Sequence, residues 1–220
     1  ICHQNRFNPP IQKLRAALDE GKFGKLVNGT ARILWNRNMG YYKQAPWRGT
    51  WKLDGGTLMN QCIHNIDLLQ WMMGGEIDTV YSQCDTFLRD IGVVEGSACV
   101  YPKNLEETLS IFGSCGTVCI GGLAVNRIET WEFEDGYKLD EEFIKNQNDP
   151  DTVYGHGHIP LFKDVIDAIK YNREPLINGE EGKKAMSIVL GAYKSRLTGL
   201  PVKFPLDKFS TMDMVKLKER

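Results

Sequence analysis

Residues 55–75, which begin and end with a glycine pair, constrain the fold most, because they predict a buried helix over 57–73 with polar side chains on one stripe. An α-helix advances about 100° per residue, so Asn60, His64 and Asp67 fall within an arc of about 60°. The rest of the circumference is apolar, which is typical of a helix inside a core. The polar stripe must therefore face other polar groups or a cleft.

The composition is that of an ordinary globular protein. With 220 residues, 42% of them hydrophobic, the chain can bury one substantial core, and we expect a single domain. Its 27 basic and 28 acidic residues are scattered, which argues against a nucleic-acid partner. No apolar run approaches the roughly 20 residues that span a bilayer, and the first residues do not resemble a signal peptide. We expect a cytoplasmic protein without a membrane segment.

Short strands precede two helices in the second half of the chain, and this order favours an α+β fold over an alternating parallel one. We expect a largely antiparallel or mixed open sheet, with helices on one face and the other face available for oligomerisation. In the later helix, the spacing of Leu161, Val165 and Ile169 predicts core packing. The expected helices are 11–18, 57–73, 161–171 and 180–197; the expected strands are 26–35, 79–88, 96–101, 107–112, 117–120 and 125–133.

A long loop over residues 36–54 is crowded with aromatic, basic and glycine residues, and it leads directly into the polar-stripe helix. Loops of this length in compact domains are usually functional or disordered, and the aromatic content argues against disorder. Its side chains could bind a carboxylate or diphosphate and stack on a ring, although a solvated loop packed on its own aromatics is the competing interpretation. The candidates for binding are Arg37, Tyr42, Trp47, Arg48 and Trp51.

Several familiar binding motifs are absent from the sequence. It contains neither GxGxxG after a strand nor GxxxxGK[ST], so the chain alone does not hold a nucleotide in either of those ways. Its six cysteines form no CxxC pair, and free thiols are expected. His156 and His158 lie in a glycine loop without an acidic third ligand, so we expect a substrate loop or a helix entry there and predict no metal site.

Four ordered segments carry a family resemblance. They are residues 4–18, QNRFNPPIQKLRAAL; residues 55–75, GGTLMNQCIHNIDLLQWMMGG; residues 157–169, GHIPLFKDVIDAI; and residues 173–202, REPLINGEEGKKAMSIVLGAYKSRLTGLPV. Together they resemble the C-terminal domain of the Gfo/Idh/MocA oxidoreductases. Within that family, residues 41–71 and 101–108 are most similar to bacterial enzymes that oxidise UDP-N-acetylglucosaminuronic acid at C3 of the sugar for lipopolysaccharide or capsule synthesis.

The resemblance implies a substrate-binding and oligomerisation domain that works as a dimer or tetramer. In the family an N-terminal Rossmann domain binds NAD or NADP and supplies a lysine from an EKP motif, and neither feature is present in this chain. Gln4, Asn5 and Arg6 would lie at the domain junction near the nicotinamide, with Gln4 and Arg6 as cofactor contacts; a plain linker is the competing interpretation. Around Asp90 the sequence departs from the family pattern, as though residues were missing.

The implied reaction moves a hydride from a sugar carbon to nicotinamide while a base removes the hydroxyl proton. His64 aligns with the active-site histidine of the family, and histidine suits proton transfer near neutral pH; a buried histidine bonded to the backbone is the structural alternative. Asn60 stands where the wider family often has Asp, and its amide can only hydrogen-bond a sugar hydroxyl. Asp67 could orient the His64 ring or could serve in packing or capping.

Two other functions fit the same residues. The chain could be an assembly module without catalytic function, or it could belong to an enzyme of the same family that acts on a free sugar or inositol.

Overall fold

The computed structural model describes residues 1–89, 91–94, 99–150 and 152–219, and the chain groups into two compact units. The first unit comprises Ile1–Ile33, Asp67–Gly74 and Glu106–Gly182. The second comprises Leu34–Ile66, Gly75–Leu105 and Lys183–Arg220. Each unit has a hydrophobic core of its own.

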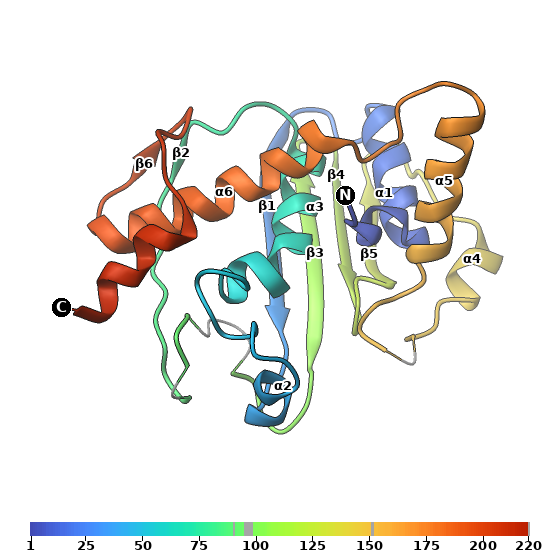
Figure 1. The fold of residues 1–220 in the computed structure, drawn as a ribbon. Helices are drawn as coiled ribbons and strands as arrows, with labels where there is room; N and C mark the ends of the chain where they lie inside the picture. The colour runs from blue at the N-terminus through green and yellow to red at the C-terminus, as the bar shows by residue number, and fades with distance from the viewer. Residues whose placement is uncertain (90, 95–98, 151, 220) are drawn as a thin grey trace. The chain divides into compact units, whose positions relative to one another are not determined.

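An open four-stranded sheet forms the first unit, with strands in the order β1-β3-β4-β5 (Figure 1). Strands β3 and β4 pair antiparallel, as do β4 and β5, and a register shift interrupts the second pairing between Cys119 and Ile120. The α+β class with an open antiparallel sheet is therefore confirmed. The strands are β1 Leu26–Leu34, β3 Glu106–Gly113, β4 Gly116–Gly121 and β5 Arg127–Phe133.

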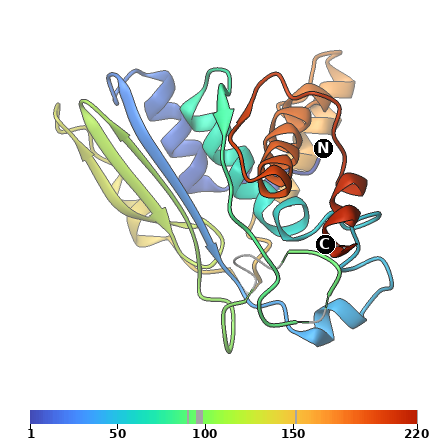
Figure 2. The ribbon, with the colours of Figure 1, turned by 90° about the vertical axis from the view of Figure 1, so that its left-hand side faces the viewer.

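Alternation along the strands sends one set of apolar side chains to the core of the first unit. Leu109 and Ile111 of β3 are fully buried, as are Val118 and Ile120 of β4. Helix α1, Pro9–Asp19, lies along that face of the sheet (Figure 2) and begins with two prolines, which suit the first helical turn. The side chains that α1 and the end of α3 add to this core are Ile11, Leu14, Ala17, Leu68 and Met72.

The second unit contains most of the long loop and the C-terminal part of the chain. Its short strand β2, Thr79–Val80, pairs antiparallel with β6, Val202–Lys203. Its core is formed by Trp51, Val93, Val94, Val189, Tyr193 and Met214. Its helical segments are α2 Met39–Lys43, a π-helical turn Leu58–Cys62, the start of α3 Ile63–Met73, most of α6 Gly179–Thr198 and a 3-10 segment Thr211–Glu219.

Three further helices belong to the first unit. They are the 3-10 helix η1 Gln4–Phe7, α4 Glu141–Lys145 and α5 His158–Lys170. Across the described ranges, no helix combines the length and the apolar composition needed to traverse a bilayer.

Most of the predicted elements are present, with several corrections. Of the strand predicted over 79–88, only Thr79–Val80 pairs; the following residues Ser82, Cys84 and Asp85 are hydrogen-bonded to α6 instead. The long loop over residues 36–54 contains α2. Of the strand predicted over 96–101, residues 96–98 lie outside the described residues, and Cys99 forms a bridge with Asn36. The suspected gap at Asp90 also falls outside them.

The predicted uniform helix over 57–73 is wrong in its first turn. Residues 58–62 form a π-helical turn, which follows an i→i+5 pattern, and α3 begins at Ile63. The α-helical angle of about 100° per residue therefore does not relate Asn60 to the residues of α3. A π turn inside a helix frequently marks a functional site.

Helix α5 also departs from expectation. Leu161 is buried, as predicted, but Val165 is 37% and Ile169 is 79% exposed. The buried face of α5 instead includes Ala168, and the predicted core stripe is largely on the surface. The apolar periodicity identified the helix correctly but not the face that packs.

Candidate functional site

Two guanidinium groups of the second unit contact the ring of Tyr41, which lies on α2. The Cζ atom of Arg37 is 5.2 Å from the centre of this ring, and that of Arg48 is 4.1 Å from it. Arg37 also lies 4.9 Å from the Trp35 ring, and Arg48 lies 4.4 Å from the Trp47 ring. These cation–π contacts hold two positive charges close together on one aromatic platform.

Hydrogen bonds join this platform to the π-helical turn. The Tyr41 hydroxyl donates to Asn60 Oδ1 at 3.2 Å and accepts from Gln61 Nε2 at 3.0 Å. Asn60 Nδ2 donates to Asp54 Oδ1, while Asp54 Oδ2 accepts from the Gly49 amide at 2.7 Å. We call the set Trp35, Arg37, Tyr41, Trp47, Arg48, Asn60 and Gln61 the Tyr41 cluster.

The Tyr41 cluster has the chemistry of an anion site. Arg48 Nε is buried and has no hydrogen-bond partner among the residues that the structure describes. Asp54, the carboxylate attached to the cluster, is already bonded through both oxygens. A carboxylate or phosphate that accepts from guanidinium groups forms strong, charge-assisted hydrogen bonds. The arrangement can therefore bind an anionic group beside aromatic rings.

Some loop residues predicted to bind have other surroundings. Trp51 is only 8% exposed and packs edge to face on Tyr193, at 5.1 Å between ring centres. Its position is that of a core residue, and its contact with a substrate stays a prediction. Tyr42 is half-buried and packs edge to face on Tyr41, and burial raises the pKa of its hydroxyl. Tyr42 thus supports the platform from one side.

Sequence reasoning missed Tyr41, Asp54 and Gln61. Tyr41 and Tyr42 are adjacent, and the five residues of α2 give no periodicity from which to choose between them. Asp54 was visible as the last residue before the glycine pair, where a carboxylate can accept from loop amides. Gln61 could not be placed, because its direction depends on the π-helical turn.

His64 lies half-buried in the first turn of α3 and belongs to the same unit as the Tyr41 cluster. It follows the π-helical turn directly. His64 thus lies next in the chain to the turn that carries Asn60. The catalytic role of His64 stays a prediction.

Asp67, further along α3, has a defined partner in the first unit. Arg6 is fully buried and donates from Nε and Nη2 to the two Asp67 oxygens, at 2.8 and 2.7 Å. Its third nitrogen, Nη1, donates to Glu181 Oε2 at 2.8 Å, and its Cζ lies 4.8 Å from the Trp71 ring. The packing interpretation of Asp67 therefore has direct support. Arg6 is enclosed by these partners, and its contact with a cofactor stays a prediction.

The rest of η1 is also buried. Gln4 donates from Nε2 to Asn5 Oδ1 at 3.3 Å, and Asn5 donates from Nδ2 to Glu107 Oε1 at 3.0 Å. At Gly157 a Cβ atom would lie 1.9 Å from the Gln4 carbonyl oxygen, so only glycine allows this approach. The segment at the start of the chain is thus a packed element and not a plain linker.

The loop with His156 and His158 leads into a helix, which is one of the two alternatives expected for it. Gly157 precedes α5, which begins at His158, and the His158 ring lies 6.1 Å from that of Tyr154. Within the described ranges, no three His, Cys, Asp or Glu side chains are grouped so that they could hold a metal ion.

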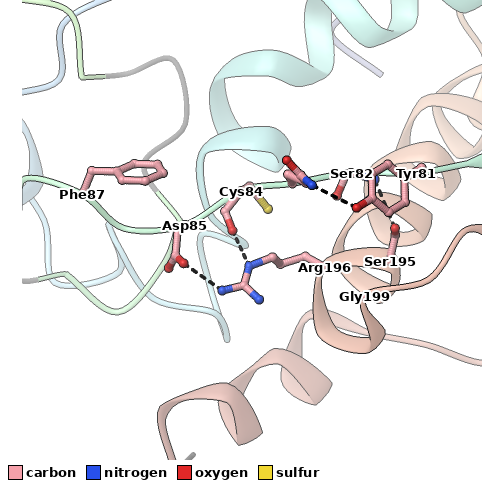
Figure 3. Close-up of a pocket in the computed structure, with 9 residues that line it drawn as sticks. Tyr81, Ser82, Cys84, Asp85, Phe87, Ser195, Arg196 and Gly199 are labelled. Atoms are coloured by element: carbon pink, nitrogen blue, oxygen red, sulfur yellow. Dashed lines mark hydrogen bonds and ion pairs between the residues drawn. The ribbon is translucent and has the colours of Figure 1, made fainter.

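A separate open cavity of about 520 Å³ lies in the second unit (Figure 3). Arg196 crosses it and donates to the Cys84 carbonyl and, at 2.9 Å, to Asp85 Oδ2. None of the predicted site residues lines it. Its lining residues are Tyr81, Ser82, Gln83, Cys84, Asp85, Phe87, Ser195, Arg196 and Gly199.

Known proteins resemble this chain over most of its length. The family model of the GFO/IDH/MocA C-terminal domain matches residues 11–103. The solved structure of the WlbA dehydrogenase from Chromobacterium violaceum, in complex with NADH and UDP-GlcNAcA, is 35% identical in sequence to this chain, with a TM-score of 0.82. The match covers 94% of this chain and 62% of the chain of that protein. The WlbA dehydrogenase from Bordetella pertussis, in complex with the same two ligands, is 32% identical with a TM-score of 0.82, and the match covers 93% of this chain and 63% of its own.

A curated relative, the uncharacterized oxidoreductase YrbE of Bacillus subtilis, is 22% identical over 92% of this chain and 62% of its own length. The chain thus spans about six tenths of the relatives that it matches. The family match, the shared fold and the identity to two WlbA dehydrogenases agree with the four sequence segments. The chain is similar to the Gfo/Idh/MocA oxidoreductases, and the similarity is to the part that forms their C-terminal domain.

Proposed function

We propose that this chain is the substrate-binding domain of an NAD- or NADP-dependent dehydrogenase that oxidises a sugar nucleotide resembling UDP-N-acetylglucosaminuronate at C3. The single observation that carries the proposal is the Tyr41 cluster. It presents two arginines on aromatic rings in the same unit as His64. The two WlbA dehydrogenases, which were solved with UDP-GlcNAcA, support the same class of substrate.

The charge of the cluster suits this substrate. A sugar nucleotide of this kind carries a carboxylate and a diphosphate, both of which accept strongly from guanidinium groups. Arg48 has a buried Nε without a partner in the described part of the chain, so an anion there would satisfy it. Trp47, which is 36% exposed, offers a face for a base or sugar ring. Asn60 uses its oxygen to hold Tyr41, which leaves its second amide hydrogen for a sugar hydroxyl.

In the proposed reaction, the cofactor and a side chain of this chain have separate roles. The nicotinamide, when bound, accepts the hydride from the sugar carbon. His64 takes the proton of the hydroxyl on that carbon, so that a carbonyl forms and charge balances. Asn60 cannot take this proton because it is an amide, and His64 is therefore the proposed acid-base group.

The cofactor belongs mainly to a domain outside this chain in our proposal. The sequence has no glycine-rich dinucleotide motif, and Arg6 is enclosed by Asp67 and Glu181. Gln4 stays the proposed contact from this chain to the nicotinamide side, and Arg6 holds the segment that carries it. Assembly as a homo-oligomer, a cytoplasmic location and a place in lipopolysaccharide sugar synthesis are further parts of the proposal.

Calorimetric titration of UDP-N-acetylglucosaminuronate into the chain tests the substrate. We predict saturable binding that Arg48→Gln and Tyr41→Ala each weaken at least about tenfold, because a lost charge-assisted bond costs about 1.5 kcal/mol or more. Arg127→Gln is the matched control, since Arg127 lies in the first unit and pairs with Asp149 at the surface. Its affinity should equal that of the unchanged chain.

The same titration separates the alternatives. Competition by UDP alone supports a sugar nucleotide. Binding of myo-inositol that UDP does not displace would instead favour the free-sugar or inositol alternative. No saturable heat with any of these ligands, from a folded chain that still oligomerises, would favour the assembly module.

A further inference from the structure

Asp54, the last residue before Gly55 and Gly56, is a buried carboxylate of the second unit, with 8% of its surface exposed. Its backbone amide donates to the Thr50 carbonyl at 3.0 Å, and the Gly55 amide donates to the same oxygen, so a turn holds the residue in place. A buried carboxylate lowers stability unless donors satisfy it. The donors that surround Asp54 therefore indicate what it does.

The first donor is the backbone of the segment that carries Arg48. Asp54 Oδ2 accepts from the Gly49 amide at 2.7 Å. This amide belongs to the planar peptide group that also contains the Cα atom of Arg48. A Cβ atom at Gly49 would lie 3.3 Å from Tyr42 Cδ1, so the segment is packed closely. The bond to Asp54 thus fixes the backbone from which Arg48 contacts the Tyr41 ring.

The second donor is the side chain of Asn60. Its Nδ2 donates to Asp54 Oδ1, while its oxygen accepts from the Tyr41 hydroxyl at 3.2 Å and from Gln61 Nε2. A carboxylate is only an acceptor, so a reversed Asn60 amide would set oxygen against oxygen at Asp54. It would also set hydrogens against those of Gln61. Asp54 therefore fixes the direction in which the Asn60 amide points.

We propose that Asp54 is a positioning residue, whose two oxygens hold the Arg48 segment and the Asn60 amide in place for one substrate. The proposal rests on the proposed function, in which Arg48 binds an anionic group of a sugar nucleotide and Asn60 binds a sugar hydroxyl. Coulomb repulsion from a carboxylate opposes the binding of an anion. The contribution of Asp54 to affinity therefore comes from its two hydrogen bonds and not from its charge.

Calorimetric titration of UDP-N-acetylglucosaminuronate into the chain tests this role. In Asp54→Asn an NH₂ group replaces one oxygen, so it faces either the Gly49 amide or the Asn60 amide, both of which are donors. The first arrangement releases the backbone at Arg48, and the second releases the amide that holds Tyr41. We expect binding to weaken at least about fivefold, although the change removes a negative charge beside an anion site.

The exchanged pair, Asp54→Asn with Asn60→Asp, is the rescue variant. The amide at position 54 then donates to the carboxylate at position 60, and its oxygen accepts from the Gly49 amide. The carboxylate still accepts from Tyr41 and Gln61, and it can accept from a sugar hydroxyl. We expect the affinity to return to within about twofold of that of the unchanged chain. The exchanged pair has one negative charge more than Asp54→Asn, so charge alone predicts the opposite change.

Asp85→Asn is the matched control. Asp85 lies in the same unit, and its carboxylate also accepts from a backbone amide, that of Thr86 at 2.9 Å. The substitution removes the same charge but none of the bonds of Asp54, so its affinity should equal that of the unchanged chain. Circular dichroism verifies the fold of each variant. If Asp54→Asn does not fold, the exchanged pair still tests the proposal, because it should both fold and bind.

The outcomes separate this role from the proposed function. Equal affinities of Asp54→Asn and the unchanged chain would overturn the positioning role and leave the proposed substrate in place. An exchanged pair that fails to fold or to recover affinity would overturn it as well. The expected affinities, without oxidation of the ligand by a protein that joins the chain to the nucleotide-binding domain proposed for it, would count against the proposed function alone. No binding by the unchanged chain would overturn both.

Discussion

Arg6 holds its charge in the interior of the first unit, with 0% of its side chain exposed. Three of its nitrogens donate to two carboxylates, and these bonds raise the pKa of the guanidinium against the effect of burial. We predict that Arg6→Leu destabilises the chain by about 3–5 kcal/mol, because the buried Asp67 carboxylate would lose the guanidinium that donates to both of its oxygens. Denaturant unfolding followed by circular dichroism measures this free energy.

A surface pair provides the comparison. Arg127 and Asp149 lie 3.4 Å apart with 47% and 45% of their side chains exposed, so Arg127→Leu should cost no more than about 1 kcal/mol. The double variant Arg6→Leu with Asp67→Leu should recover part of the loss, since it removes both charges. Equal effects of Arg6→Leu and Arg127→Leu would contradict this account of the buried pair.

Single residues also set the limit of what the sequence predicts. Guanidinium and aromatic side chains of the loop could be singled out as binding candidates, because long loops of this composition are usually functional, and the structure brings Arg37 and Arg48 onto one ring. Binding by them stays a prediction. Which tyrosine would be central could not be chosen, since α2 has only five residues. The burial of Trp51 could not be foreseen, because a loop tryptophan can face either the core or a ligand and local sequence does not say which.

At the scale of elements, the chain bends at two glycines just before the π-helical turn that leads into α3. Gly55 and Gly56 have φ values of 75° and 86°, which other residues rarely adopt. A Cβ atom at Gly56 would also lie 2.8 Å from the Tyr193 hydroxyl. We predict that Gly56→Ala destabilises the chain by about 2–4 kcal/mol, from backbone strain of about 1–2 kcal/mol plus the steric conflict.

Gly136→Ala is the matched variant for this prediction. Gly136 has a φ of 71°, but a Cβ atom there would meet nothing within 4 Å, so only the backbone strain remains. Its cost should be about 1–2 kcal/mol in the same unfolding measurement. If Gly56→Ala and Gly136→Ala lower the free energy of unfolding by the same amount, the contact with the Tyr193 hydroxyl would not contribute to the cost at position 56.

Elements with a strong period were predictable, and those set by tertiary contacts were not. The strands β3 and β4 and the helices α1 and α6 follow from alternation, helical spacing and turn residues. The π-helical turn at 58–62 does not, because no local pattern distinguishes i→i+5 from i→i+4 pairing. In α5 the period identified a helix, yet Ile169 is 79% exposed, since the periodicity does not show which apolar side chains find a partner.

At the scale of the whole chain, two compact units share two helices. Helix α3 begins in the second unit and ends in the first, and α6 begins in the first and ends in the second. The α+β class was predictable from the order of strands and helices. The division into units was not, because each unit draws on segments far apart in the sequence.

The proposed dehydrogenase depends on one side chain more than any other. The most direct test measures turnover of UDP-N-acetylglucosaminuronate, followed as NADH formation, in a protein that joins this chain to the nucleotide-binding domain that we propose for it. We predict that His64→Ala lowers turnover at least about tenfold, the low end for loss of an acid-base group, while His156→Ala, a change in the exposed histidine loop, leaves it unchanged. Unchanged turnover in a folded His64→Ala protein would contradict the central claim.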